Sequence, residues 1–426
     1  MPAPLFGDTF PDTEIFGDAY MQDPYGAYVR LRKAGPVHQA KTPSGLPVWV
    51  VTDYEAVRAA LTDGRLAKDA DRMRAIADRK TAAAGGPSSV SETLAANMLN
   101  SDPPDHTRLR KLVVKAFTTR RVEQLRPRIA GITDELLDSL ELRARNGQAV
   151  DLIKDFAFPV PIAVICELLG IPLAERETFR AWSKTLVGAG PREDVRHASM
   201  AMGGYLMQVI AAKRAQPSDD LLSDLIQVSD DGDRLDRLEV VSMTMLLLVA
   251  GHETTVNLIG NGILALLRHD DQRAALRADE SLIRGAVEEL LRYDGPAPMA
   301  TMRFTAEPVE IGGVTIPAGE IVFLGLAAAN RDGSRFDRPD ELDITRPIGG
   351  HLGFGFGIHH CVGAPLARLE AEVTLGKFLR RFPDARLAVS PGALRWRSSV
   401  IMRGLESLPT TLALAGRVAH ADTDTK

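Results

Sequence analysis

The sequence predicts a mainly α-helical fold with a minor β region. Apolar residues at helical spacing dominate the chain, and the best such pattern covers residues 238–268. Strand-like runs gather after Arg292, where residues 309–311 and 314–316 flank a Gly-Gly pair that favours a hairpin. No Pro-, Gly- or Ser-rich linker divides the 426 residues, so we expect one large domain.

The expected elements follow from a period of two in strands and of three to four in helices. The domain is expected over residues 1–416, and a polar tail over 417–426 is expected to be disordered. A polar stretch over 68–91 predicts a long loop, and Asp105 is the expected N-cap of the next helix. Helices are expected at 25–33, 54–61, near 106 to 117, 122–141, 162–169, 175–186, after 191 to 207, 238–268 and 365–381, and strands at 48–51, 309–311, 314–316, 321–324, around 387 and at 400–402.

Charge and cysteine content exclude several classes of protein. A net charge of −5, from 51 basic and 56 acidic residues, does not favour nucleic-acid binding. The two cysteines, Cys166 and Cys361, form no disulfide framework and indicate a reducing compartment. No stretch approaches the ~20 apolar residues of a membrane span, and no signal-peptide pattern opens the sequence. We therefore expect a cytoplasmic monomer that binds neither nucleic acid nor membrane.

Cys361 belongs to the most informative motif, Phe354-x-x-Gly357-x-x-x-Cys361-x-Gly363. Alternating glycines before the cysteine allow tight turns and a close approach to a large flat group. A thiolate at the start of a helix feels the peptide dipoles, which lower its pKa and favour metal binding. The alternative is a small buried apolar side chain, which is the interpretation we favour for Cys166 on an apolar helical face.

This motif resembles the haem-binding loop of cytochrome P-450 monooxygenases, and the similarity extends over essentially the whole chain. The resemblance implies haem b as cofactor, with Cys361 as the axial iron ligand and Phe354 and Gly363 in the binding loop. Thiolate ligation of this kind favours O–O cleavage. It also implies the cytochrome P-450 fold, with the haem between the long central helix and the helix after the cysteine.

The long central helix carries Ala-Gly-His-Glu-Thr-Thr at residues 250–255. Glycine and β-branched threonines are poor choices inside a helix, and a threonine hydroxyl can bond an earlier carbonyl and bend it. On these residues alone, a kink with a surface acid is equally open. The resemblance implies that Thr254 hydrogen bonds dioxygen and that Glu253 relays protons. His252 is left without a role, since Val256 replaces the second histidine of a zinc-protease motif.

Glu289 and Arg292 lie one helical turn apart and can form an ion pair. An isolated surface pair would contribute little. The spacing is similar to the Glu-x-x-Arg of the same family, whose third partner matches Arg346. The resemblance implies a structural trio that holds the cysteine loop, and a buried trio is costly to break.

His106 and Arg110 are spaced to share one helical face, which suits an anionic group, although solvated helix charges are the usual alternative. The run over residues 102–110 resembles the propionate-binding helix of the family. Arg303 and His359 match the remaining propionate contacts, whereas His360 matches none.

The implied reaction is monooxygenation with O2 of a hydrophobic small molecule. The run over residues 115–127 resembles soluble bacterial members, several of which act on macrolides and other polyketides in actinomycetes, so a polyketide or macrolide is expected before a terpenoid or steroid. Residues 68–91 and 188–191 match the lid loops of the family. The positions that match its substrate pocket are Leu246, Val249, Ala250, Met299, Thr301 and Ile401.

Electrons are expected from a separate ferredoxin and ferredoxin reductase, because the roughly 65 residues after Cys361 are too few for an ordinary attached domain. Either a basic face for an acidic partner or a solvated helix face explains Lys111, Lys115, Arg120, Arg121 and Arg368. Two other functions remain open, a peroxide-driven enzyme and a non-catalytic haem protein. The intact pair of Glu253 and Thr254 favours dioxygen activation over both.

Overall fold

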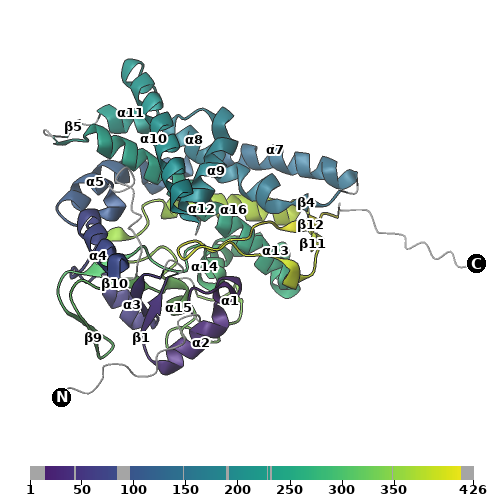
Figure 1. The fold of residues 1–426 in the computed structure, drawn as a ribbon. Coiled ribbons are helices and arrows are strands. Elements are labelled where there is room, and N and C mark those ends of the chain that lie inside the picture. Colours follow the sequence, from purple (N-terminus) through teal and green to yellow (C-terminus); the bar gives the residue numbers. More distant parts are fainter. Residues whose placement is uncertain are drawn as a thin grey trace, which may run out of the picture.

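The fold was taken from a computed structural model, which describes residues 15–42, 45–83, 96–146, 148–188, 191–227, 229–230, 233–347 and 349–413. Helices dominate, and the strands form small sheets, which confirms the predicted fold class. In Figure 1 the first helices and the largest sheet lie at the bottom of the view, and α7 to α11 lie at the top.

The helix α12 (Arg237–Arg268) forms the centre of the molecule and matches its predicted bounds closely. A capping box starts it, in which Asp236 accepts from the Glu239 N–H and the Glu239 carboxylate accepts from the Asp236 N–H. It packs against α8 (Pro159–Leu169), α14 (Ile283–Asp294) and α16 (Ala364–Arg381). Because neighbours surround it, apolar residues cover most of its circumference.

The other helices surround this centre. Single turns of 3-10 or π geometry join several of them. The helices are α1 (Asp18–Gln22), α2 (Tyr25–Ala34), α3 (Tyr54–Ala60), α4 (Ala70–Ala83), α5 (Asp105–Val114), α6 (Thr119–Glu123), α7 (Arg126–Arg145), α9 (Arg176–Val187), α10 (Arg192–Ala215), α11 (Leu221–Gln227), α13 (Asp270–Ala278) and α15 (Leu326–Asn330), and the single turns are η2 (Met98–Asn100), η3 (Lys115–Phe117), η4 (Ile153–Ala157), η5 (Leu173–Glu175), η6 (Glu280–Leu282), η7 (Gly357–His359) and η8 (Pro391–Ala393).

The largest sheet has the strand order β1-β2-β10-β7-β3. Only β2 and β10 run parallel, and the other neighbours are antiparallel. In the hairpin of β8 and β9, Gly312 and Gly313 take positive φ values, as the predicted turn requires. The strands are β1 (Val37–Lys41), β2 (Pro47–Val51), β3 (Leu66–Ala67), β4 (Val150–Asp151), β5 (Ser229–Asp230), β6 (Asp233–Arg234), β7 (Arg303–Thr305), β8 (Val309–Ile311), β9 (Val314–Ile316), β10 (Ile321–Leu324), β11 (Arg386–Leu387) and β12 (Pro409–Thr411).

Two predicted segments differ in the amino-terminal half. The loop expected over residues 68–91 is helical from Ala70 to Ala83, because Met73 and Ile76 bury one face three residues apart; residues 84–95 lie outside the described ranges. Asp105 is not an N-cap: Pro104 holds that position, and Asp105 lies in the first turn of α5, where its charge suits the helix dipole.

Three further predictions need correction or stay open. The helix expected at 122–141 is divided into α6 and α7, with Pro127 in the first turn of α7. No strand forms at residues 400–402, where the Met402 N–H donates to the Ser399 hydroxyl; the last strand is β12. The break expected at 188–191 agrees with the end of α9 and the start of α10, but residues 189–190, like the tail over 417–426, lie outside the described ranges. The domain limits stay a prediction.

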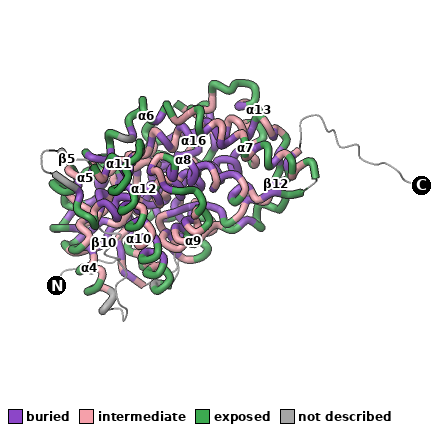
Figure 2. Tube along the Cα trace, turned by 90° about the horizontal axis from the view of Figure 1, so that it is seen from above, coloured by how far each residue is buried: buried purple, intermediate pink, exposed green. Residues whose placement is uncertain are grey.

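Buried residues concentrate around α8, α12 and α16, and exposed segments surround them (Figure 2). Across the described helices, none combines the length and the apolar character needed to cross a bilayer.

Candidate active site

Cys361 opens onto a cavity between α12 and the cysteine loop, which we define as residues 353–363. The cavity and its mouth contain about 1550 Å³ of space that protein atoms do not fill. Its walls are mainly apolar and come from α12, the segment before β7 and the segment after residue 400. A large, mostly apolar cavity with a few polar groups is the usual form of a ligand site.

The cysteine loop is shaped by its glycines. Gly355 and Gly357 have φ values of 69° and 75°, which side chains other than glycine rarely adopt. A Cβ on Gly357 would also lie 3.0 Å from the Leu61 carbonyl oxygen. The Cys361 N–H donates to the Phe354 carbonyl at 2.9 Å and closes the turn just before α16. The glycines therefore fix Cys361 at the cavity wall.

The Cys361 thiol is accessible from the cavity but lies deep in the protein. Burial raises the pKa of this thiol, and the Gly363 N–H and Arg110 counter the effect only in part. The start of α16 does lower the pKa of the thiol, as expected, through the Gly363 and Ala364 N–H groups, but burial outweighs this effect. A coordinated metal ion would deprotonate the thiol outright.

Thr254 lies on the cavity face of α12, together with Leu246 and Ala250. Its hydroxyl donates to the Ala250 carbonyl at 2.8 Å, so its lone pairs remain available to a group in the cavity. Gly251 has a packing role that we did not expect, because a Cβ there would lie 2.8 Å from Ile165 of α8. Thr254 and its neighbour Thr255 are thus the polar side chains of α12 that line the same cavity as Cys361.

Glu253 is buried and is not among the residues that line the cavity. Its Oε2 accepts from Arg397 Nη1 at 2.7 Å, and its Oε1 lies 3.7 Å from His252 Nε2. Burial alone would raise the pKa of Glu253, but His252 and Arg397 lower it to about 2. No local sequence pattern indicates Arg397 as the partner of Glu253, because the two residues are 144 positions apart in the chain.

His252, for which the sequence indicates no role, connects Glu253 to α9 through its contact with Ser183. Its Nδ1 lies 2.6 Å from the Leu248 carbonyl oxygen, and its Nε2 lies 3.0 Å from the Ser183 hydroxyl. Both His252 and Ser183 are fully buried. The acid on α12 is therefore held from two sides, by Arg397 and by a histidine anchored on α9.

Three of the four predicted propionate contacts, Arg110, Arg303 and His359, line the cavity together with Lys68, and the buried His106 contacts His359. We call Lys68, His106, Arg110, Arg303 and His359 the cationic cluster. The rings of His106 and His359 meet edge to face with centroids 4.3 Å apart, and Arg110 Nη2 donates to the His360 carbonyl at 2.7 Å. Burial is the main cause that lowers the pKa of His359 to about 2 and that of Arg303 to about 10.

Several nitrogens of this cluster have no partner in the described structure. Both ring nitrogens of His106 and Nε of Arg303 are buried without a hydrogen bond. Unpartnered buried donors are rare in native proteins and point to a missing acceptor. The donor set fits a haem: Cys361 faces the cavity, apolar side chains line it, and the cationic cluster is placed for the propionates. Phe354 and Gly363 also line the cavity, as predicted.

The predicted substrate contacts are found in the cavity with one exception. Leu246, Ala250, Met299, Thr301 and Ile401 line it. Val249 does not line it but packs against the apolar core, because its position on α12 is rotated away from the face of Ala250 and Thr254.

The structural trio is also assembled, and we call Glu289, Arg292 and Arg346 the closed cluster. Arg292 binds both oxygens of Glu289, at 2.7 and 2.8 Å, and its remaining N–H groups reach the carbonyls of Asn330, Pro339 and Glu341. Arg346 Nε lies 3.2 Å from Glu289 Oε2. The side chains of the closed cluster come from α14 and from the segment that leads to the cysteine loop.

Glu288 forms a second support that the sequence did not predict. Its carboxylate accepts from Arg368 Nε at 2.5 Å and lies 2.9 Å from His351 Nε2. The Arg368 guanidinium also stacks 4.5 Å from the centroid of the Phe354 ring. Arg368 therefore contacts and supports the cysteine loop, a role that neither of the two predicted alternatives, a face for a redox partner or a solvated helix face, had included.

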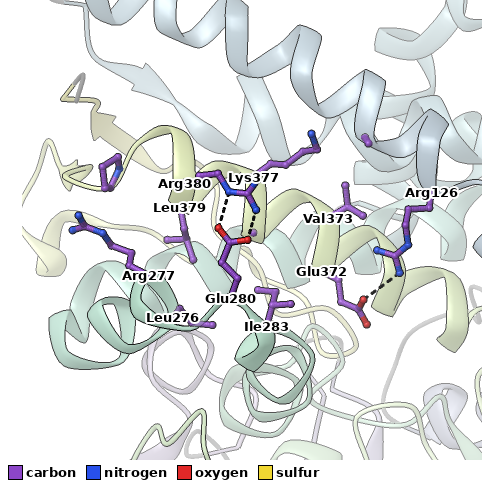
Figure 3. A pocket seen from close by; sticks show the side chains of 13 residues that line it. Arg126, Leu276, Arg277, Glu280, Ile283, Glu372, Val373, Lys377, Leu379 and Arg380 are labelled. Atoms are coloured by element: carbon purple, nitrogen blue, oxygen red, sulfur yellow. Dashed lines mark hydrogen bonds and ion pairs between the residues drawn. The ribbon is translucent and has the colours of Figure 1, made fainter. Parts of the chain in front are cut away.

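A second cavity lies between α7, α13, α14 and α16 (Figure 3), and the space in it and its mouth that protein atoms do not fill is about 1080 Å³. Its charged walls are paired: Arg380 Nε donates to Glu280 at 2.8 Å, and Arg126 Nη2 donates to Glu372 at 3.4 Å. None of the predicted site residues lines it. The chemistry therefore belongs to the cavity of Cys361.

Comparison with known proteins agrees with this site. The family model described as "Cytochrome P450" matches residues 190–385. The chain is 55% identical to cytochrome P450 107B1 of Saccharopolyspora erythraea, over 94% of this chain and 97% of the relative. It is 49% identical to the vitamin D(3) 25-hydroxylase of Pseudonocardia autotrophica, over 94% and 96% of the two chains.

A third relative is the 6-deoxyerythronolide B hydroxylase of Saccharopolyspora erythraea, 44% identical over 95% of this chain and 99% of that protein. The likeness thus covers nearly the full length of each relative, including the cysteine loop, the central helix and the cationic cluster. The chain belongs to the cytochrome P450 family, and the protein is a haem-binding monooxygenase.

Proposed function

We propose that the protein inserts one oxygen atom from O2 into a polyketide or macrolide, by hydroxylation or epoxidation, with Cys361 as the axial ligand of the haem iron. The observation that carries this proposal is the mainly apolar cavity that both Cys361 and Thr254 line. When bound, the haem supplies the oxygen chemistry, and the protein supplies binding, orientation and protons.

Thr254 is proposed to deliver the last step of a proton path. Its hydroxyl donates a hydrogen bond to the Ala250 carbonyl, so the hydroxyl oxygen is free to accept a proton from a water in the cavity. By rotating, the hydroxyl can then donate its own proton. Glu253 faces away from the cavity and is bound to Arg397. To bring a proton to Thr254, the carboxylate has to leave Arg397, which makes this ion pair a control point of the path.

The substrate class is argued from the walls of the cavity. Leu246, Met299 and Ile401 present apolar side chains, which suit a large hydrophobic molecule. Similarity to the 6-deoxyerythronolide B hydroxylase favours a macrolide as the substrate. Similarity to the vitamin D(3) 25-hydroxylase favours a steroid-like molecule as the second candidate. A spin-state titration of the ferric protein with a macrolactone and with vitamin D(3) decides between them; tighter binding of the macrolactone supports the first choice.

Electrons are proposed to come from a ferredoxin and its reductase. With Arg368 engaged by Glu288, the basic face for this partner consists of Lys111, Lys115, Arg120 and Arg121 around α5 and α6. Charge reversal at Arg120 and Arg121, which are exposed, is expected to slow reduction by ferredoxin but not by dithionite. Equal slowing with both reductants would contradict this surface.

The Thr254→Ala variant tests the proton path. With Thr254 removed, we expect O2 consumption to continue but product per electron to fall by about 10²-fold or more, with hydrogen peroxide released instead. Thr244→Ala is the matched control, because Thr244 is buried on the same helix, bonds back to the Val240 carbonyl in the same way and does not line the cavity; it is expected to keep its coupling. Unchanged coupling in Thr254→Ala would favour a peroxide-driven enzyme, and absence of product from the wild type with any reductant would favour a non-catalytic haem protein.

A further inference from the structure

The outer face of α10 carries no charged side chain over about four helical turns. Residues 198–212 contain no Asp, Glu, Lys or Arg, although 25% of the chain is charged. The inner side of α10 packs against α9, α11 and α12, and the helix lies at the edge of the molecule in Figure 2. We call the outward-facing residues of this stretch the α10 face; six are exposed and Gly204 is half-buried, and they are Met200, Ala201, Gly204, Met207, Gln208, Ala211 and Ala212.

Two large apolar side chains project from the α10 face. Met200 is 62% exposed and Met207 is 42% exposed, and their spacing places them on the same side of the helix. Gly204 lies between them, and a Cβ at this position would meet no atom within 4 Å. Single exposed apolar residues are normal on a protein surface, whereas a continuous uncharged patch is typical of an interaction site.

Charges of opposite sign lie at the two ends of the α10 face. Glu193 and Asp194 are in the first turn of α10, and Arg214 is in the last turn. Glu193 pairs with Arg196 and His197 of its own helix, whereas Arg214 forms no ion pair with any residue that the structure describes. A second α10 in antiparallel orientation would bring acid to base at both ends. A parallel one would bring like charges together, which is unfavourable.

We propose that the α10 face joins two copies of this chain in an antiparallel dimer, with Gly204 of each copy at the two-fold axis. In such a dimer every contact occurs twice. Met200 and Met207 lie at nearly equal distances from Gly204, on either side of it, so each methionine packs against the other methionine of the second copy. Glu193 and Arg214 also lie at nearly equal distances from Gly204, and Arg214 thereby gains a carboxylate. This proposal replaces the monomer expected from the sequence.

The composition of the α10 face favours a second copy over a lipid surface. Helices that lie on membranes combine large apolar residues such as Trp, Phe and Leu with Lys and Arg. The α10 face offers alanines, a glycine and two methionines, and its first turn is acidic. Small residues instead allow two helix axes to approach to about 8 Å. Two paired helices form a small interface, so we expect a reversible dimer with a dissociation constant in the micromolar range.

Sedimentation velocity of the haem-loaded protein, from about 1 to about 200 µM, tests the dimer. Gly204→Glu places two like charges at the axis, and we expect its dimer to be at least about tenfold weaker. Leu142→Glu is the matched control, because Leu142 is a 64% exposed apolar residue on α7, and it should dimerise like wild type. A wild type that stays monomeric at every concentration, or a dimer that Gly204→Glu does not weaken, would overturn the proposal.

The variant Gly204→Glu should fold, because a side chain has space at this position and Glu favours a helix more than Gly does. An unchanged haem spectrum and an unchanged unfolding midpoint check this. If Gly204→Glu does not fold, Met207→Glu, at an already exposed side chain, is expected to weaken the dimer in the same way.

Disulfide cross-linking tests the antiparallel orientation, since a disulfide forms only between Cα atoms about 4–7 Å apart. Met200→Cys and Met207→Cys are mixed in equal amounts, with a size tag on one of them, and oxidised mildly. We expect the mixed disulfide to exceed both self-linked products, and Leu142→Cys to give no cross-link. Self-linked products in excess would indicate parallel helices and overturn the proposal.

A vesicle assay examines the other occupant of the α10 face. Wild type and Gly204→Glu are floated with phosphatidylcholine vesicles. Absence of binding by either protein supports the dimer. Binding by the wild type that Gly204→Glu loses would assign the α10 face to a membrane surface and overturn the proposal.

Discussion

The closed cluster and the cationic cluster are both buried groups of charges, but only one is complete without a ligand. In the closed cluster, Arg292 and Glu289 satisfy each other, and backbone carbonyls take the remaining N–H groups of Arg292. In the cationic cluster, His106 and Arg303 keep unpartnered buried nitrogens, and Lys68 contacts only a hydroxyl.

This difference indicates that the closed cluster supports the fold, whereas the cationic cluster binds a ligand. A buried ion pair that is fully hydrogen-bonded repays its desolvation within the protein, whereas unpaired buried donors cost free energy until an acceptor arrives. The closed cluster therefore stabilises the chain with or without haem. The cationic cluster opposes folding of the empty protein and contributes stability only when a dianion is bound.

Removal of the charge of Glu289 should have the largest effect on stability. In Glu289→Gln, the buried Arg292 and the partly buried Arg346 lose their carboxylate, and we expect a loss of about 3–5 kcal/mol of unfolding free energy. Urea unfolding of the haem-free and haem-loaded proteins should show similar losses. Glu55→Gln, at an exposed position on α3, is the control and should change little. A loss confined to the haem-loaded protein would assign Glu289 to the cofactor instead.

Glu370 of α16 offers a third case for this comparison, because it is a buried acid that forms no ion pair with a described cation. Among the described residues no cation pairs with it; burial raises the pKa of Glu370 to about 8, and the neighbouring Thr255 hydroxyl counters this effect only in part. A raised pKa in the folded state means that the folded protein binds the extra proton between about pH 4.5 and 8, so stability falls as the pH rises through this window.

The Glu370→Gln variant should remove this dependence. The difference in unfolding free energy between variant and wild type is expected to grow in favour of the variant, by up to about 1.4 kcal/mol per pH unit across the window. Urea unfolding at pH 5 and pH 8 measures it. A difference that does not change with pH would show that Glu370 is ionised in the folded protein.

Lys68→Met should have opposite effects on the two forms of the protein, each of about 2–3 kcal/mol. Without haem, the variant loses a buried amine beside Arg303 and should be more stable than wild type. With haem, the variant lacks one donor of the cationic cluster, so the stability that haem adds should be smaller than in wild type. Thermal or urea unfolding of both forms checks this, and a loss of stability in both forms would place Lys68 with the closed cluster.

The smallest expected effect is that of Arg397→Met, about 1–2 kcal/mol at neutral pH. Arg397 contributes to the low pKa of Glu253, so its stabilisation is present above the unfolded pKa near 4.5 and is lost as the pH falls towards 2. The difference between wild type and variant should therefore shrink between pH 7 and pH 3 in urea unfolding. A difference that stays constant would indicate that Arg397 acts through packing alone.

Short-range motifs made much of the site predictable. The cysteine loop, the Thr254 segment and the pair of Glu289 and Arg292 are each contained in a few consecutive residues, and each predicted partner lies where the fold brings it. The central helix was predictable because its apolar pattern continues through residue 268. Its polar segment at 250–255 does not break it, since hydroxyls such as that of Thr254 bond back to the helix.

The missed residues depend on contacts between distant segments. Lys68 reaches the cationic cluster through the pairing of β3 with β7, and Arg397 meets Glu253 across 144 residues. Neither contact leaves a local pattern. The polar composition of residues 68–91 hid the helix α4, whose buried face consists of a few apolar residues only. Val249 was misplaced because motif matching does not specify which face of α12 meets the cavity.

The most direct test of the whole account is the carbon monoxide difference spectrum of the dithionite-reduced protein, recorded for wild type and for Cys361→His. If Cys361 holds the haem iron in this cavity, the wild type should show the strongly red-shifted Soret band of thiolate ligation, and the variant should lose that band while it still binds haem. A wild-type band typical of histidine ligation, or a thiolate band that persists in Cys361→His, would contradict the account.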